Sequence, residues 1–145
     1  MKKNIIVSSF AILLVIILAA FKYTGDVLPI GSALPKGDHQ MKDIRNEDIS
    51  VKDAVRKNGL LVMFTCNTCP YVIKNQERTK AICKYALQHN IGVILLNSNE
   101  CDRQGGNSFG AMQQYAKVQT YEWYYVVDKN NEIADFFDTN RTPEN

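Results

Sequence analysis

The chain has 145 residues, of which 46% are hydrophobic and 22% are charged, a composition typical of one globular domain that excludes disordered and fibrous proteins and a second sizeable domain. Three of the 17 basic residues flank an apolar N-terminal segment, which leaves 14 basic against 15 acidic residues elsewhere. Nucleic-acid-binding proteins usually show an excess of basic residues, so we expect no nucleic-acid partner.

An apolar segment follows two lysines at the N-terminus. Residues Ile5–Phe21 are apolar apart from two serines, and Lys2 and Lys3 precede them. This order is typical of a signal peptide or signal anchor, so we predict that residues 1–22 direct export. Leu18 occupies a position where a cleavage site takes a small residue, which favours an uncleaved single-helix membrane anchor. The domain is then expected in the periplasm or cell envelope, anchored to the inner membrane.

A linker joins this segment to the domain. Residues 23–37 are rich in glycine, proline and small side chains, which indicates a linker. The domain itself is predicted over residues 38–145. Its first expected elements are a short strand over Met41–Ile44, a turn over Arg45–Asp48 and a brief helix over Val51–Lys57 capped by Ser50.

Three short apolar runs then alternate with helical patterns. The runs are predicted as strands, the first two of them buried on both faces, at Leu60–Thr65, Ile91–Leu96 and Glu122–Val127. Apolar residues at three- and four-residue steps or capping residues predict helices over Pro70–Asn90, Phe109–Val118 and Glu132–Phe137. Strands that alternate with helices imply a parallel sheet with right-handed crossovers, so the predicted fold class is α/β.

The sequence Cys66-Asn67-Thr68-Cys69 lies between the first predicted strand and the long helix, and Pro70 follows it. Proline suits the first helical turn, where no backbone N–H is needed. A thiol at a helix N-terminus faces unpaired N–H groups and the positive end of the helix dipole, which stabilise the thiolate that attacks disulfides. Two intervening residues let the second cysteine resolve a mixed disulfide, so such a pair can cycle between dithiol and disulfide.

The run FTCNTCPYV, the earlier LPKGDHQMKDI and the later NRTP resemble the exported redoxin group of the thioredoxin-like superfamily, which is related to alkyl-hydroperoxide-reductase and thiol-specific-antioxidant domains. The resemblance covers Leu34–Pro143. It implies a three-layer thioredoxin-like sheet with flanking helices. It also implies an exported thiol–disulfide oxidoreductase whose partners are client protein thiols or disulfides and an unidentified redox protein, with no cofactor and no metal.

The same resemblance assigns roles to the site residues. It implies that Cys66 is the nucleophile and that Cys69 is the resolving cysteine. We also predict that Cys66 is exposed at the first position and that Cys69 lies deeper in the helix turn, shielded by Pro70. Thr142-Pro143 matches the loop whose proline is cis and faces the disulfide, and a cis X-Pro bond is uncommon enough to be a deliberate feature. The residues between the cysteines, Asn67 and Thr68, are predicted to support the site together with Pro70 and this loop.

The sequence departs from the family pattern in two respects. The family continues beyond the proline through two antiparallel strands and a last helix, whereas this sequence ends at Asn145. We therefore expect a C-terminally incomplete fold that lacks the hairpin and the last helix. The strand Leu60–Thr65 also carries no acidic residue, whereas thioredoxins have a buried acid there that helps deprotonate the resolving cysteine.

A peroxiredoxin-like peroxidase is the alternative enzyme. Peroxiredoxins have a threonine three residues before the peroxidatic cysteine. Three residues before Cys69 stands Cys66, and three residues before Cys66 stands Met63. The spacing therefore favours dithiol–disulfide exchange over peroxide reduction.

Two alternatives are not enzymes. A metal-binding module would need a second ligand pair spaced like the first, whereas Cys83 and Cys101 are eighteen residues apart and His39 and His89 are solitary. A degraded thioredoxin-like module would keep the fold without the chemistry. Cys83 lies on the apolar helix face and is expected to be a buried, inert hydrophobe. Cys101 follows the second predicted strand, so it is expected at the same sheet edge as the cysteine motif, with packing favoured over a redox role.

Overall fold

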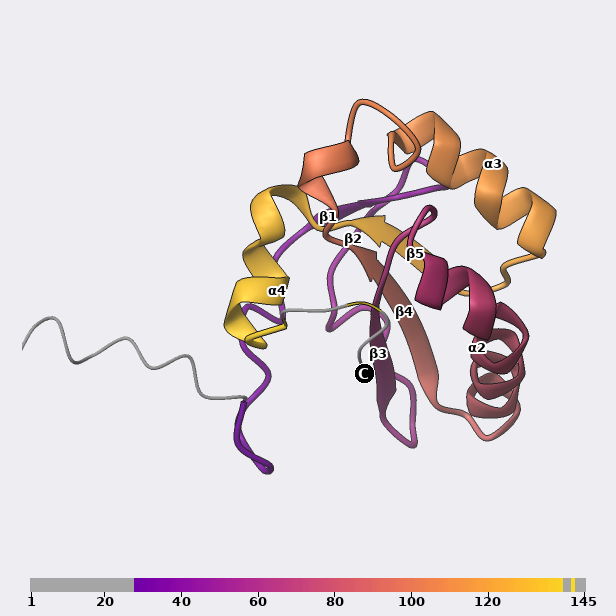
Figure 1. The fold of residues 1–145 in the computed structure, drawn as a ribbon. Coiled ribbons are helices and arrows are strands. Elements are labelled where there is room, and N and C mark those ends of the chain that lie inside the picture. The colour runs from indigo at the N-terminus through magenta and orange to yellow at the C-terminus, as the bar shows by residue number, and fades with distance from the viewer. Residues whose placement is uncertain (1–27, 140–141, 143–145) are drawn as a thin grey trace, which may run out of the picture.

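The computed structural model describes residues 28–139 and residue 142. Five strands form one sheet in the order β2-β1-β5-β4-β3 (Figure 1). The strands are β1 (Met41–Asp43), β2 (Asp48–Ile49), β3 (Leu60–Thr65), β4 (Gly92–Asn97) and β5 (Tyr124–Val127). β3, β4 and β5 run parallel, as predicted, while β1 pairs antiparallel with both β5 and β2 and makes the sheet mixed.

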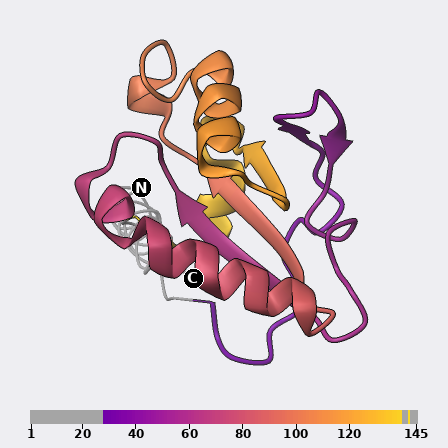
Figure 2. The same ribbon diagram turned by 90° about the vertical axis from the view of Figure 1, so that its right-hand side faces the viewer.

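Helices cover both faces of the sheet. α2 and α3 lie across one face, and the short α4 lies on the opposite face (Figures 1 and 2). Their bounds are α2 (Pro70–Gln88), α3 (Phe109–Gln119) and α4 (Glu132–Phe136), with 3₁₀ turns η1 (Glu100–Asp102) and η2 (Lys129–Asn131). The helices predicted over Pro70–Asn90, Phe109–Val118 and Glu132–Phe137 are therefore confirmed, each within two residues of its expected ends.

The central strand β4 carries the core on both of its faces. Ile94 and Leu96 pack with α4 on one side, and Val93 and Leu95 pack with α2 and α3 on the other. All six residues of β4 are buried, which confirms the prediction of a strand covered on both faces. β3 matches the prediction less well. Its first three residues are only half-buried, because β3 is an edge strand among the described residues.

The ends of α3 follow from local chemistry. Ser108 is its N-cap, as predicted, and the Ser108 hydroxyl accepts a hydrogen bond from the Ala111 N–H at 3.4 Å. At the other end Thr120 takes a left-handed conformation with φ 56°, which lets its N–H reach the last carbonyl groups of the helix. α2 begins at Pro70, with Cys69 as its N-cap.

Two predictions for the segment before β3 are wrong. No helix forms over residues 51–57. Val51 to Ala54 make a single turn, and Arg56 and Gly59 then pair across a tight reversal that leads directly into β3. Ser50 still acts as a cap, because its hydroxyl accepts the Asp53 N–H at 3.2 Å. The expected turn over residues 45–48 ends earlier, because Asp48 already pairs with β1 in the strand β2.

The predicted signal segment 1–22 and Pro143 lie outside the described residues. So does the first part of the predicted linker 23–37, while its last ten residues form turns and irregular structure. Within residues 28–139, no helix combines the length and the apolar character needed to cross a membrane.

Candidate active site

The carboxyl ends of three parallel strands meet at one edge of the sheet. β3 ends next to Cys66, β4 ends at Asn97, and β5 ends next to Asp128. Open α/β sheets keep their sites at this edge. The cysteine motif, the loop that holds Cys101 and the beginning of α4 are therefore brought to one end of the sheet, although they are far apart in the sequence.

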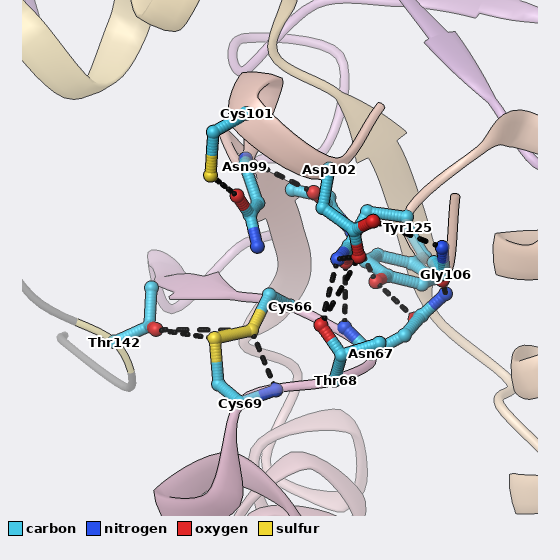
Figure 3. The surroundings of a disulfide bond; sticks show 12 residues. Cys66, Asn67, Thr68, Cys69, Asn99, Cys101, Asp102, Gly106, Tyr125 and Thr142 are labelled. Carbon is cyan, nitrogen blue, oxygen red and sulfur yellow. Dashed lines mark hydrogen bonds between the residues drawn. A yellow bond between two sulfur atoms is a disulfide. The ribbon is translucent and has the colours of Figure 1, made fainter. Parts of the chain in front are cut away.

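Cys66 and Cys69 form a disulfide at the start of α2 (Figure 3), and their Cα atoms are 5.7 Å apart. The Cys69 backbone N–H donates a hydrogen bond to Cys66 Sγ at 3.0 Å. After reduction, the same N–H and the positive end of the α2 dipole would stabilise a thiolate on Cys66. The structure thus joins the two predicted redox cysteines, with Pro70 at the first helical position as expected.

The relative burial of the two cysteines differs from the prediction. Cys66 is 1% exposed, whereas Cys69 is only half-buried. The expectation of an exposed Cys66 and a more shielded Cys69 is therefore wrong for the disulfide form. The Thr142 hydroxyl contacts both sulfurs, since it lies 3.9 Å from Cys66 Sγ and donates to Cys69 Sγ at 3.2 Å. Thr142 is therefore at the disulfide, as predicted.

A cleft of about 270 Å³ opens beside Cys69. Thr142 lines it together with Ser98 and Asn99, which follow β4, and with residues of η2 and α4. Cys69 is thus the cysteine of the pair that borders this cleft.

A buried polar network lies behind the cysteine loop. Asn97 is fully buried, and its Nδ2 donates to Asn107 Oδ1 at 2.8 Å and to the Tyr125 hydroxyl at 2.9 Å. Both acceptors also bond Asn67, so the network joins the end of β4, a residue of β5 and the loop before α3 to this predicted supporting residue. Sequence reasoning missed these residues. The available signal was Asn97, a polar residue that ends an apolar run at the edge where α/β sheets hold their sites.

Neither of the other two cysteines contacts the disulfide through a hydrogen bond in the part of the chain that the structure describes. Cys83 is fully buried among the residues of α2, β4 and α3, which confirms its predicted place in the core. Burial raises the pKa of the Cys83 thiol to about 12. Cys101 is exposed in η1, and its thiol donates to Asn99 Oδ1 at 2.8 Å (Figure 3).

This difference predicts selective alkylation of the oxidised protein. At about pH 8.5, iodoacetamide is expected to modify the exposed Cys101 and to leave the buried Cys83 untouched. The burial that raises the Cys83 pKa keeps that thiol protonated and covered. Intact-mass spectrometry should show one added group per native chain and two per chain unfolded in denaturant without reductant. Equal labelling of both thiols in the native protein would contradict the buried position of Cys83.

The histidines lie apart from the disulfide. His39 Nδ1 is 3.6 Å from Glu132 Oε2, and His89 ends α2 with its ring stacked on Tyr85 at 3.9 Å between ring centroids. Within the described ranges, no group of three or more histidine, cysteine, aspartate or glutamate side chains is placed to hold a metal ion.

A scan against protein-family models returns no match, and neither does a search of the curated proteins. Solved structures do resemble the chain. An uncharacterised conserved protein from Geobacillus kaustophilus is 22% identical over 81% of this chain, with a TM-score of 0.74. A hypothetical protein from Sinorhizobium meliloti is 20% identical over 81% of this chain, with a TM-score of 0.69. The chain spans 62% and 63% of the length of these two proteins.

A secreted disulfide oxidoreductase from Mycobacterium tuberculosis has the same fold. It is 10% identical, with a TM-score of 0.56, and the alignment covers 72% of this chain and 71% of that chain. The chain therefore has a thioredoxin-like α/β fold, with a mixed sheet between helices on both faces. The predicted fold class is confirmed.

Proposed function

We propose that the protein is a thiol–disulfide oxidoreductase whose redox centre is the Cys66–Cys69 pair. The observation that carries this proposal is the disulfide between the end of β3 and the beginning of α2, with the Cys69 N–H bonded to Cys66 Sγ. This N–H stabilises negative charge on Cys66 selectively, so Cys66 is the nucleophile in the direction of client reduction. Cys69 is the resolving cysteine.

The exchange has two steps. The Cys66 thiolate attacks one sulfur of a client disulfide, forms a mixed disulfide and releases the other client sulfur as a thiolate. Cys69 then loses its proton and attacks Cys66 Sγ, which closes the Cys66–Cys69 disulfide and releases the second client thiolate. The client gains two electrons and, after protonation, two protons, and the pair loses them. A redox partner that supplies two electrons returns the pair to the dithiol.

The supporting residues position this chemistry. Pro70 has a backbone φ fixed near the helical value, so α2 begins directly after Cys69. The hydroxyl of Thr142 covers both sulfurs, and the client displaces it when it reaches Cys66. Pro143 is proposed to hold this loop against the disulfide through a cis peptide bond.

The proposed setting is the periplasm or cell envelope, with residues 1–22 as the export signal or anchor, residues 23–37 as the linker and residues 38–145 as the redox domain. The order of lysines and apolar residues in the first segment supports export. The secreted oxidoreductase with the same fold also supports it. Recovery of the protein as a soluble cytoplasmic pool would contradict this location.

Two parallel assays with the purified protein test the function. In the first, the protein is mixed with a disulfide-bonded protein substrate and a small dithiol as electron donor, and free substrate thiols are counted over time. We expect faster substrate reduction than with the dithiol alone. In the second, hydrogen peroxide replaces the disulfide substrate. Peroxide turnover with sulfenic acid on Cys66 or Cys69, and no disulfide exchange, would contradict the proposal in favour of a peroxidase.

A further inference from the structure

Both residues between the two cysteines are bonded to side chains and loops from elsewhere in the chain (Figure 3). Asn67 makes three such bonds. Its backbone N–H donates to Asn107 Oδ1 at 2.8 Å, its Nδ2 donates to the Gly106 carbonyl at 2.8 Å, and its Oδ1 accepts from the Tyr125 hydroxyl at 2.7 Å. Asn67 is 7% exposed, so water does not substitute readily for these partners.

Thr68 is held as well, although it is exposed. Its hydroxyl accepts from Asn107 Nδ2 at 3.0 Å and donates to Asp102 Oδ2 at 3.3 Å. Both the donor and the acceptor role of this hydroxyl are therefore used. The loop that connects β4 to α3 therefore bonds both residues of the Asn67-Thr68 dipeptide.

Asn107 is the centre of these contacts. It is fully buried, and its side chain accepts from Asn67 N and Asn97 Nδ2 and donates to Thr68 Oγ1 and Asp102 Oδ2, each at 2.8–3.0 Å. A side-chain amide has two donor and two acceptor positions, so all four are used. Loss of any one partner leaves a buried polar atom unpaired, which opposes local loosening.

Gly106 shows how closely the two segments approach. A Cβ atom added to Gly106 would overlap Thr68 Cγ2 and would lie 3.2 Å from Asp102 Oδ2. The backbone of Gly106 is not in the left-handed region, so a side chain is excluded there by contact alone. We call Asn97, Asp102, Gly106, Asn107 and Tyr125 the dipeptide clamp.

We propose that Asn107 is a positioning residue which, through the dipeptide clamp, sets the equilibrium between the dithiol and the disulfide of Cys66 and Cys69. This inference rests on the proposed function. A fixed Asn67-Thr68 dipeptide keeps the two sulfurs near bonding distance in the dithiol form, so less conformational freedom is lost when the disulfide closes. The clamp therefore favours the disulfide and makes the pair a stronger reductant.

Tyr125 supports the clamp at every working pH. It is 1% exposed, and burial raises the pKa of its hydroxyl. The hydroxyl therefore stays protonated and continues to donate to Asn67 Oδ1.

The contact between Gly106 and Thr68 allows the proposal to be tested with a disruptive variant and a second substitution that restores the fit. Gly106→Ala should push Thr68 away and open the clamp, because the new methyl group overlaps Cγ2. Thr68→Ser removes that methyl group and keeps the hydroxyl, so the double variant should close the clamp again. The measurement is the equilibrium constant for oxidation of the pair by glutathione. We expect Gly106→Ala to lower it about tenfold, which raises the reduction potential by about 30 mV, and the double variant to return within about twofold of the wild type.

Asn107→Ala is the second variant, with the same expected direction and a larger effect, because it removes four hydrogen bonds at once. Near-ultraviolet circular dichroism identifies the variants that fold. An equilibrium constant within twofold of the wild type in a folded Gly106→Ala or Asn107→Ala protein would overturn the proposal. An equilibrium constant above that of the wild type would also overturn it. If the wild-type pair failed to exchange with glutathione at all, the proposed function itself would fail, which is a distinguishable result.

Discussion

Replacing Cys66 with serine is expected to abolish disulfide exchange, to the rate of the small dithiol alone. A serine hydroxyl does not ionise under these conditions, so the N–H of Cys69 that faces Cys66 Sγ would have no thiolate to stabilise. Replacing Cys69 with serine is expected to fail differently. Cys66 still attacks the client, but no thiol resolves the product, so a one-to-one mixed disulfide should accumulate through Cys66.

Both variants are best made in a Cys101→Ser background. Cys101 is exposed and would otherwise compete for the client disulfide. The Cys101→Ser protein is itself the matched control and should exchange at the wild-type rate, since its side chain bonds only Asn99 among the described residues. Peptide mass mapping of non-reduced samples identifies the linked cysteine.

Because the two cysteines differ in burial, trapping of the client on Cys69 instead of Cys66 would also be informative. Cys69 borders the cleft, whereas Cys66 is 1% exposed. A client trapped on Cys69 in the Cys66→Ser variant, with no trapping in Cys69→Ser, would show that accessibility decides the attack and would reverse the two roles. Trapping on Cys66 would show that stabilisation of the thiolate by the helix N-terminus decides it, and that the Thr142 contact opens to admit the client.

Replacing Ile94 with alanine is expected to lower the free energy of unfolding by about 2–5 kcal/mol. Ile94 is 0% exposed at the middle of a strand that is paired on both sides, and it packs in the cluster that joins β4 to α4. The neighbouring strands hold the backbone in place, so the cavity cannot collapse easily.

Denaturant unfolding with the disulfide intact measures this loss. Val118→Ala is the matched control, because Val118 is 64% exposed on α3 and its replacement should change stability by less than about 0.5 kcal/mol. A loss below about 1 kcal/mol for Ile94→Ala would contradict the position of β4 in the centre of the core.

The sequence alone predicted the elements whose signals are local. The apolar runs that became β3 and β4, the long amphipathic pattern of α2 and the cap at Ser108 each depend on neighbouring residues, and all were found. The cysteine motif was also placed correctly between strand and helix, because Cys66, Cys69 and Pro70 are adjacent in the chain. The position of Thr142 near this motif was predicted from the resemblance to a family.

Local patterns failed where an element depends on a distant partner. β2 has only two residues, which is too few to show the alternation of apolar and polar residues that predicts a strand. They form a strand only because β1 lies beside them. The segment after Ser50 has the composition of a helix, but the chain reverses at Gly59 to enter β3 and leaves room for only one turn.

Only the tertiary structure decided how the cysteine pair is held and covered. Asn107 lies forty residues after Asn67, and Tyr125 lies fifty-eight residues after it, so no spacing rule relates them. They meet because Tyr125 lies on β5, beside β4 in the sheet, and Asn107 lies in the loop that leads from β4 to α3, where buried polar groups must satisfy one another. The relative exposure of Cys66 and Cys69 likewise follows from what packs against them, and a two-residue spacing in the sequence carries no information about that packing.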